Sequence, residues 1–250
     1  MLENVYRLVS SLEVQQQKQE LTAQNIAGAN MPGFKGRHIH TNSFEREMAI
    51  ARDEADLSGF GVTASDEMTN FADGPIKNTQ RALDFAVSGD GFFKVQTPDD
   101  KILLTRDGRF HLSADGQLKT NEGYNVMGQN GPITLPTDVS LNTLSVSDEG
   151  VLESATPQGE RQEVGTLDIG TVENKNDLQR LSGKYYKPAE NQDVQNAENV
   201  SLNNKCYEDA NVSAIREMTE MIQTTRRFEM GHKMISMFRQ LSQQENRKMN

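Results

Sequence analysis

The chain has 250 residues, with 36 acidic and 26 basic side chains and a formal net charge of −10. The acidic surplus lies in the middle, where residues 83–200 hold 19 Asp plus Glu against 10 Lys plus Arg, so we expect no nucleic-acid partner. Apolar runs span only a few residues, far fewer than the roughly 20 that cross a bilayer, so we expect no membrane insertion. The first twelve residues also lack the apolar stretch of a secretory signal, so we expect no cleaved signal peptide.

The N-terminal segment, residues 1–33, is predicted to form a long helix. One seam along it is marked by residues at alternating steps of three and four: Leu2, Val5, Val9, Leu12, Gln16, Gln19, Ala23 and Ile26. The sequence Asn30-Met31-Pro32-Gly33 should end this helix, because proline disfavours helical geometry in the preceding residue and glycine accepts the exit turn.

Residues 34–82 show no sustained period and are predicted to form an extended connector, with one short helix near residues 44–55. His38 and His40 lie in this connector without an evident third ligand, so surface histidines are favoured over a metal site. We expect no metal and no cofactor.

The middle segment, residues 83–190, is predicted to be a mainly antiparallel β domain. Short β-type runs alternate with glycine-containing turns at Asp107-Gly108, Asp115-Gly116, Glu122-Gly123 and Asn130-Gly131. Turns at intervals of about 7 to 8 residues require short antiparallel strands.

Residues 191–211, rich in Asn and Gln, are predicted to be a polar linker, and residues 212–250 a second long helix for which Asp209 and Asn211 are candidate N-caps. Its seam again steps by four and three: Ala214, Met218, Met221, Thr225, Phe228, His232 and Ile235. The helix carries further methionines at Met230, Met234 and Met237. We interpret them as helix-packing residues and not as a promiscuous binding face.

The predicted fold class is therefore α+β, with the terminal helices pairing as a coiled-coil-like stalk and the β domain between them. Polar residues occupy the centre of both seams, which weakens an isolated pair while fixing its register. We expect the two ends to be loose in the monomer and to become helical when neighbouring subunits supply contact surface.

Several motifs resemble a known family. Residues 24–35, QNIAGANMPGFK, are similar to the N-terminal signature of bacterial flagellar rod and hook proteins, usually N-N-(I/L)-A-N-x-x-T-x-G-(F/Y)-K. The resemblance continues in family order through residues 83–95, 105–110, 115–118, 208–212 and 226–229, the last followed by Lys233. Departures from the usual pattern occur at Gln24, Gly28, Met31, Ala210 and Thr225.

The resemblance implies a structural, non-enzymatic subunit of the flagellar basal-body rod, located in the periplasm. Such subunits polymerise through their terminal helices into the axial shaft that transmits motor torque to the hook, with the β domain as an outer layer. Implied partners are copies of the same chain, adjacent rod and hook proteins, and the flagellar type III export apparatus. The length is similar to the distal rod protein or its close paralogue, and the short connector favours the paralogue.

Assembly contacts or helix-end geometry are expected at Asn25, Ile26, Pro32, Gly33, Phe34, Asn211, Val212, Met218, Met221, Phe228, Glu229 and Ile235. Two other readings stay open. One is a non-flagellar envelope binding module that carries its β domain on a helical stalk. The other is an enzyme of unrecognised type, which a deep pocket containing ionisable groups with strongly perturbed pKa values would support, although no catalytic motif is recognised.

Overall fold

The computed structural model describes residues 2–43, 62–136, 139, 141–155, 161–189, 192–197 and 200–248. Its chain contacts divide it into two compact units, each made of segments that are distant in sequence. The first, here called the helical unit, comprises Met1–Ala27, Arg37–Asn70 and Ser213–Asn250. The second, here called the β unit, comprises Gly28–Gly36 and Phe71–Val212.

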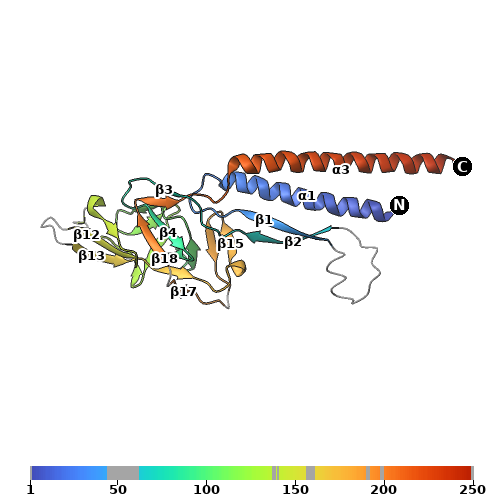
Figure 1. Cartoon of the computed structure of the whole chain (residues 1–250). Helices are drawn as coiled ribbons and strands as arrows, with labels where there is room; N and C mark the ends of the chain where they lie inside the picture. The colour runs from blue at the N-terminus through green and yellow to red at the C-terminus, as the bar shows by residue number, and fades with distance from the viewer. Residues whose placement is uncertain are drawn as a thin grey trace. The chain divides into compact units, whose positions relative to one another are not determined.

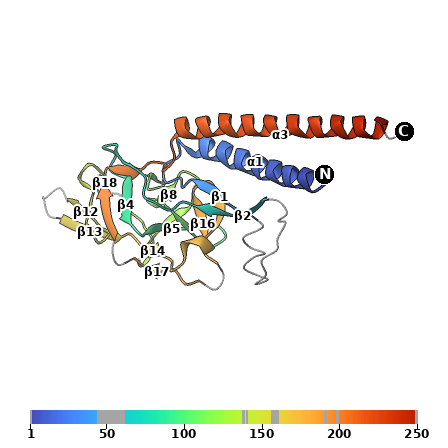
Figure 2. The same cartoon turned by 45° about the vertical axis from the view of Figure 1, so that its right-hand side comes forward.

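The helical unit contains α1 (Leu2–Gly28), α3 (Ala214–Lys248) and a strand pair, β1 (Arg37–Ser43) with β2 (Val62–Thr69). The two helices lie side by side and run antiparallel, as both views show (Figures 1 and 2). Gln19 Nε2 donates to Thr225 Oγ1 at 3.2 Å, and a Cβ on Gly231 would lie 2.5 Å from the Leu12 side chain. The α+β class with two terminal helices in contact is therefore confirmed.

The contacting faces of the helices differ from the predicted seams by about one residue. On α3, the step-of-seven positions Ala214, Met221, Phe228 and Ile235 are half-buried as expected. The most buried intermediate positions are Glu217, Thr224 and Gly231; Met218 and His232 are exposed, and Thr225 is half-buried beside Thr224 and hydrogen-bonded to Gln19. On α1, Val9, Gln16 and Ala23 are exposed, and the buried side chains include Val14, Leu21 and Thr22.

Small and polar residues explain this shift, because they let the helices approach closely. Thr224 is fully buried and its hydroxyl donates to the Glu220 carbonyl at 2.8 Å, while Thr22 donates to the Lys18 carbonyl at 2.8 Å. The hydroxyls are thus satisfied within each helix. Among the described residues, no helix is long and apolar enough to cross a membrane.

The β unit is built from short, mostly antiparallel strands. These are β3 (Ile76–Asn78), β4 (Phe85–Gly89), β5 (Phe92–Gln96), β6 (Ile102–Thr105), β7 (Phe110–Leu112), β8 (Leu118–Thr120), β9 (Asn125–Gly128), β10 (Gly131–Pro132), β11 (Ser145–Val146), β12 (Val151–Ala155), β13 (Arg161–Thr166), β14 (Ile169–Thr171), β15 (Gln179–Ser182), β16 (Tyr185–Lys187), β17 (Gln195–Asn196), β18 (Val200–Asn204) and β19 (Cys206–Glu208). Two 3-10 helices, η1 (Leu141–Thr143) and η2 (Lys175–Asp177), lie between them.

The largest sheet follows the order β15-β16-β6-β5-β9-β8-β7, with β10 on β9 and with β14 pairing both β5 and β17. Smaller sheets are β11-β12-β13, β18-β4 and β19-β3. The predicted turns at Asp115-Gly116 and Glu122-Gly123 connect β7 to β8 and β8 to β9. The main core lies under these sheets and includes Phe85, Phe93 and Phe110.

Two segments differ from the sequence-based division. The predicted connector, residues 34–82, carries β1, β2 and β3, and its expected short helix at residues 44–55 lies outside the described residues. The predicted polar linker, residues 191–211, carries β17, β18 and β19. The side-chain amides of β18 bond to distant parts of the chain: Asn203 donates to Ser88 Oγ, and Asn204 donates to the Leu144 carbonyl. Leu202 is the one buried residue of β18.

The core of the β unit gives a stability prediction. Phe93 is fully buried on β5, and its ring meets that of Phe110 edge to face at a centroid distance of 5.2 Å. Phe93→Ala should lower the free energy of unfolding of the β unit by about 3–5 kcal/mol. Leu181→Ala, at a side chain that is 57% exposed, should change it by less than about 0.5 kcal/mol in the same urea titration. Equal effects of the two variants would contradict this core assignment.

Candidate assembly site

The β unit holds a buried loop from the N-terminal part of the chain, Gly28–Gly36, here called the root loop. It follows α1 and precedes β1, and all its residues except Asn30 and Met31 are buried. Gly28 and Gly33 leave no room for a side chain: a Cβ on Gly28 would lie 2.1 Å from the Phe34 ring. The helix ends at Gly28, just before residues 30–33, which are predicted to stop it, and the loop that follows packs Phe34 against Gly28.

Inside the β unit, the root loop meets the segment just before α3 at a buried charge cluster. This cluster consists of Lys35, Asp73, Arg106 and Glu208. The Lys35 ammonium lies 2.6 Å from one Glu208 carboxylate oxygen, and Arg106 lies 3.3 Å from the other. All three side chains are 2% exposed or less, so the two cations and the carboxylate compensate each other away from water.

Further hydrogen bonds tie the cluster to the surrounding backbone, although Arg106 Nε has no hydrogen-bond partner among the described residues. Lys35 donates to the Ala72 carbonyl at 2.8 Å, and the Gly74 amide donates to Glu208 Oε1 at 2.7 Å. The Arg106 guanidinium donates to backbone carbonyls of β4 and lies 5.0 Å from the centre of the Phe92 ring. Burial lowers the pKa of Lys35, and the Glu208 carboxylate opposes that shift.

Phe34 and Asn211 complete this junction. The Phe34 ring lies 4.5 Å beneath the Arg180 guanidinium, which also donates to the Lys35 carbonyl at 2.7 Å. Asn211 accepts from the Gly36 amide at 2.8 Å and donates to the Ala72 carbonyl at 2.9 Å. Asn211 therefore holds the root loop against the segment that precedes α3.

In the helical unit, Asn25 has a comparable role. Its side chain accepts from the Arg37 amide at 3.0 Å and donates to the Arg37 carbonyl at 2.9 Å and to Glu217 at 3.2 Å. Arg37 in turn pairs with Gln24 and Glu67. One buried amide thus joins α1 to β1 and to the first turn of α3.

Outside the helix contact, α3 exposes large apolar side chains. They form two groups at helical spacing, here called the outer apolar groups: Ile215, Met218 and Ile222, followed by Met230, Met234 and Met237. Each is between 49% and 80% exposed. Met221, on the contact face, is half-buried, and the packing role expected for the exposed methionines stays a prediction, because their partner would be another subunit.

The predicted assembly residues fall into separate groups. Pro32, Gly33 and Phe34 are buried in the root loop, where the Phe34 carbonyl accepts from the Asn211 amide, and Val212 follows Asn211 half-buried. Asn25 lies in the helical unit, with Ile26 beside it half-buried.

The α3 residues divide by exposure. Met221, Phe228 and Ile235 lie half-buried on the contact face, whereas Met218 and Glu229 point away from it.

The sequence analysis did not predict that Lys35, Arg106, Glu208 and Arg180 form the junction of the β unit. Three of them stand inside the quoted motifs, but charged side chains are almost never fully buried, so composition alone assigns them to the surface. The available signal was the position of two of them: Lys35 closely follows the Pro32-Gly33 turn, and Glu208 lies a few residues before the predicted start of the second helix.

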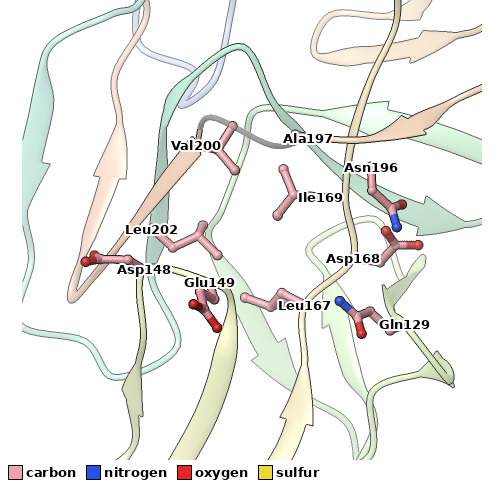
Figure 3. Close-up of a pocket in the computed structure, with 10 residues that line it drawn as sticks. All are labelled: Gln129, Asp148, Glu149, Leu167, Asp168, Ile169, Asn196, Ala197, Val200 and Leu202. Carbon is pink, nitrogen blue, oxygen red and sulfur yellow. The ribbon is translucent and has the colours of Figure 1, made fainter.

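The β unit also contains an open pocket of about 250 Å³ (Figure 3). Its walls combine apolar side chains such as Leu167, Ile169 and Leu202 with the carboxylates of Asp148, Glu149 and Asp168. Asp168 is already paired with Lys94 at 2.8 Å. The lining holds neither a histidine base nor a serine, cysteine or lysine nucleophile, and the described residues contain no metal-ligand cluster. This pocket gives no geometry for catalysis.

Comparison with known proteins decides the family. The flagellar basal-body rod protein FlgF of Salmonella typhimurium is 30% identical over 239 residues, which cover 93% of this chain and 92% of that protein. The chain belongs to the flagellar basal-body rod protein family.

Other rod proteins of this family match along nearly their whole length. FlgG of Bacillus subtilis is 28% identical, covering 94% of this chain and 95% of that protein, and FlgF of Escherichia coli is 28% identical, covering 93% and 92%. Residues 86–154 match the model "Flagellar hook protein FlgE/F/G D1 domain", and residues 207–247 match "Flagellar basal body rod FlgEFG protein C-terminal". The protein is thus a non-enzymatic structural subunit of the flagellar basal-body rod.

The junction of this rod protein gives a second prediction. Gly33 has φ +68°, and a Cβ there would lie 2.3 Å from the Asp107 amide nitrogen, whereas Gly123 has φ +88° with open space around it. Gly33→Ala should destabilise the β unit by at least about 1 kcal/mol more than Gly123→Ala. Both variants place alanine in a left-handed backbone conformation that it disfavours, but only the first also creates a clash with backbone atoms. Chemical denaturation measures both. Indistinguishable midpoints would contradict the tight packing of the root loop.

Proposed function

We propose that this rod subunit polymerises through its terminal helices into the axial shaft that transmits motor torque to the hook. The observation that carries the proposal is the pair of outer apolar groups on α3, which are exposed although α1 and α3 already contact each other. Exposed apolar patches on a soluble chain mark interaction surfaces. In a polymer, neighbouring copies would cover them.

The composition of the helix contact supports the same proposal. Among the described residues, side-chain hydrogen bonds join Gln19 to Thr225 and Asn25 to Glu217 across the two helices, and Gly231 contributes only backbone against Leu12. The apolar side chains of α3 at this contact, Met221, Phe228 and Ile235, are only half-buried, so the helix pair leaves apolar surface for a neighbour to cover. Further stabilisation would come from other subunits.

The proposed partners are copies of this chain, adjacent rod and hook proteins, and the flagellar type III export apparatus. The proposed location is the periplasmic part of the basal body, reached without cleavage of a signal peptide. The assembly contacts proposed on α3 divide into two sets. Met218 and Glu229 face other subunits, while Met221, Phe228 and Ile235 hold α3 against α1.

A surface substitution tests the role of the outer apolar groups. Ile222 is 56% exposed, and its neighbour Gln223 is also exposed. Ile222→Glu should reduce the polymer recovered by sedimentation about tenfold or more and impair motility, because burying an unpaired carboxylate costs more than the about 1.4 kcal/mol that a factor of ten represents. Gln223→Glu adds the same charge without removing an apolar side chain and should assemble. Normal rod yield and swimming with Ile222→Glu would refute the surface.

Circular dichroism tests the expected order of the ends. At a dilution where sedimentation shows only monomer, the far-ultraviolet helical signal should be lower than α1 and α3 together require, and it should rise when polymer forms. The physical reason is that the apolar residues of α3 at the helix contact are only half-buried in one chain. Full helicity in the monomer would show that the ends need no neighbours.

A further inference from the structure

We infer that the β unit closes in one cooperative step that waits for its last segment, residues 200–211. This segment carries β18, β19 and the carboxylate of the charge cluster, and it lies far along the chain from the root loop that it contacts. The inference rests on contacts within the β unit alone and does not depend on the proposed polymerisation.

Backbone pairing is the first support. β18 pairs along the whole of β4, placing Leu202 opposite Val87 and Asn204 opposite Phe85. The three residues Phe85–Val87 are 2% exposed or less. Without β18, backbone groups of β4 would stay unpaired next to the main core, at a cost comparable to lost hydrogen bonds.

The same segment also completes the root loop. The Gly33 amide donates to the Glu208 carbonyl at 2.8 Å, and the Asn211 amide donates to the Phe34 carbonyl at 3.2 Å. On the other side, β19 pairs with β3, and the Asp209 amide donates to the Pro75 carbonyl at 2.9 Å. The root loop, β3 and β4 therefore all pair with this one segment, which comes much later in the chain.

Charge gives the strongest constraint. Lys35 and Arg106 are both 1% exposed, and the other carboxylate of the cluster, Asp73, is 51% exposed. Before residue 208 is in place, two cations would have to enter the interior with only one partly solvated carboxylate between them. Because burying an uncompensated charge is strongly unfavourable, the root loop and the sheet stay open until Glu208 arrives. A chain delivered from its N-terminus thus remains open in this unit until nearly all of it is present.

Hydrogen exchange of the purified full-length protein, followed by mass spectrometry, tests cooperativity. Glu208→Gln should accelerate exchange about a hundredfold or more, by the same factor in the root loop, in β4 and in the central strand β5. Glu149→Gln, at an exposed carboxylate of the same unit, should leave these rates unchanged. Acceleration confined to the root loop and residues 200–211, with β5 unchanged, would overturn the inference.

The double variant Lys35→Met/Glu208→Gln separates charge balance from loss of a hydrogen bond. It removes one cation together with the carboxylate, so that Arg106 and Asp73 balance each other, and it should recover at least about tenfold of the lost protection. Exchange as fast as in Glu208→Gln, or failure of the double variant to fold, would overturn the role of charge.

Refolding of the unmodified chain tests the order of events. In pulse labelling after dilution from denaturant, amides of β4 and β5 should gain protection in the same kinetic phase as those of β18. Protection of β4 and β5 in an earlier phase than β18 would show that the sheet closes without its last segment, and would overturn the inference.

Discussion

The fold of the β unit depends on one buried charge cluster, in which Lys35 and Arg106 share the carboxylate of Glu208 away from water. Lys35 and Glu208 are separated by 173 positions, yet their charged groups lie 2.6 Å apart and essentially unexposed. A buried pair of this kind adds little net stability compared with apolar packing, but either partner alone is strongly unfavourable. The cluster therefore acts chiefly by excluding structures in which the two ends of the unit are apart.

The helical unit follows the opposite balance. Its internal contact combines buried Leu12, Val14 and Leu21 of α1 with polar and small residues such as Thr224 and Gly231, whereas six large apolar side chains of α3 are exposed. A chain that buried these six side chains in its own helix pair would have a more stable monomer and less apolar surface for neighbours. In the assembly proposed above, the polar contacts set the register of the helices and the outer apolar groups contact neighbouring subunits.

The sequence predicted the class of each region better than its details. Apolar periodicity and Asp-Gly turns indicated terminal helices around short antiparallel strands, and the step-of-seven positions from Ala214 to Ile235 were placed on the correct face. The intermediate positions were assigned one residue too late, because Met218 looks more like a packing residue than Glu217. β18 was missed because backbone pairing leaves almost no trace in an Asn-rich segment. The charge cluster was missed because it needs a tertiary contact to become visible.

The antiparallel course of α1 and α3 brings the start of α1 and the end of α3 to the same side of the helical unit, where α3 extends past α1 (Figure 1). Each residue of extended peptide spans at most about 3.5 Å, so this overhang sets the minimum length of an insert that joins the two helices. A head-to-tail ligation with an insert of that length would close the polypeptide into a ring without unwinding either helix.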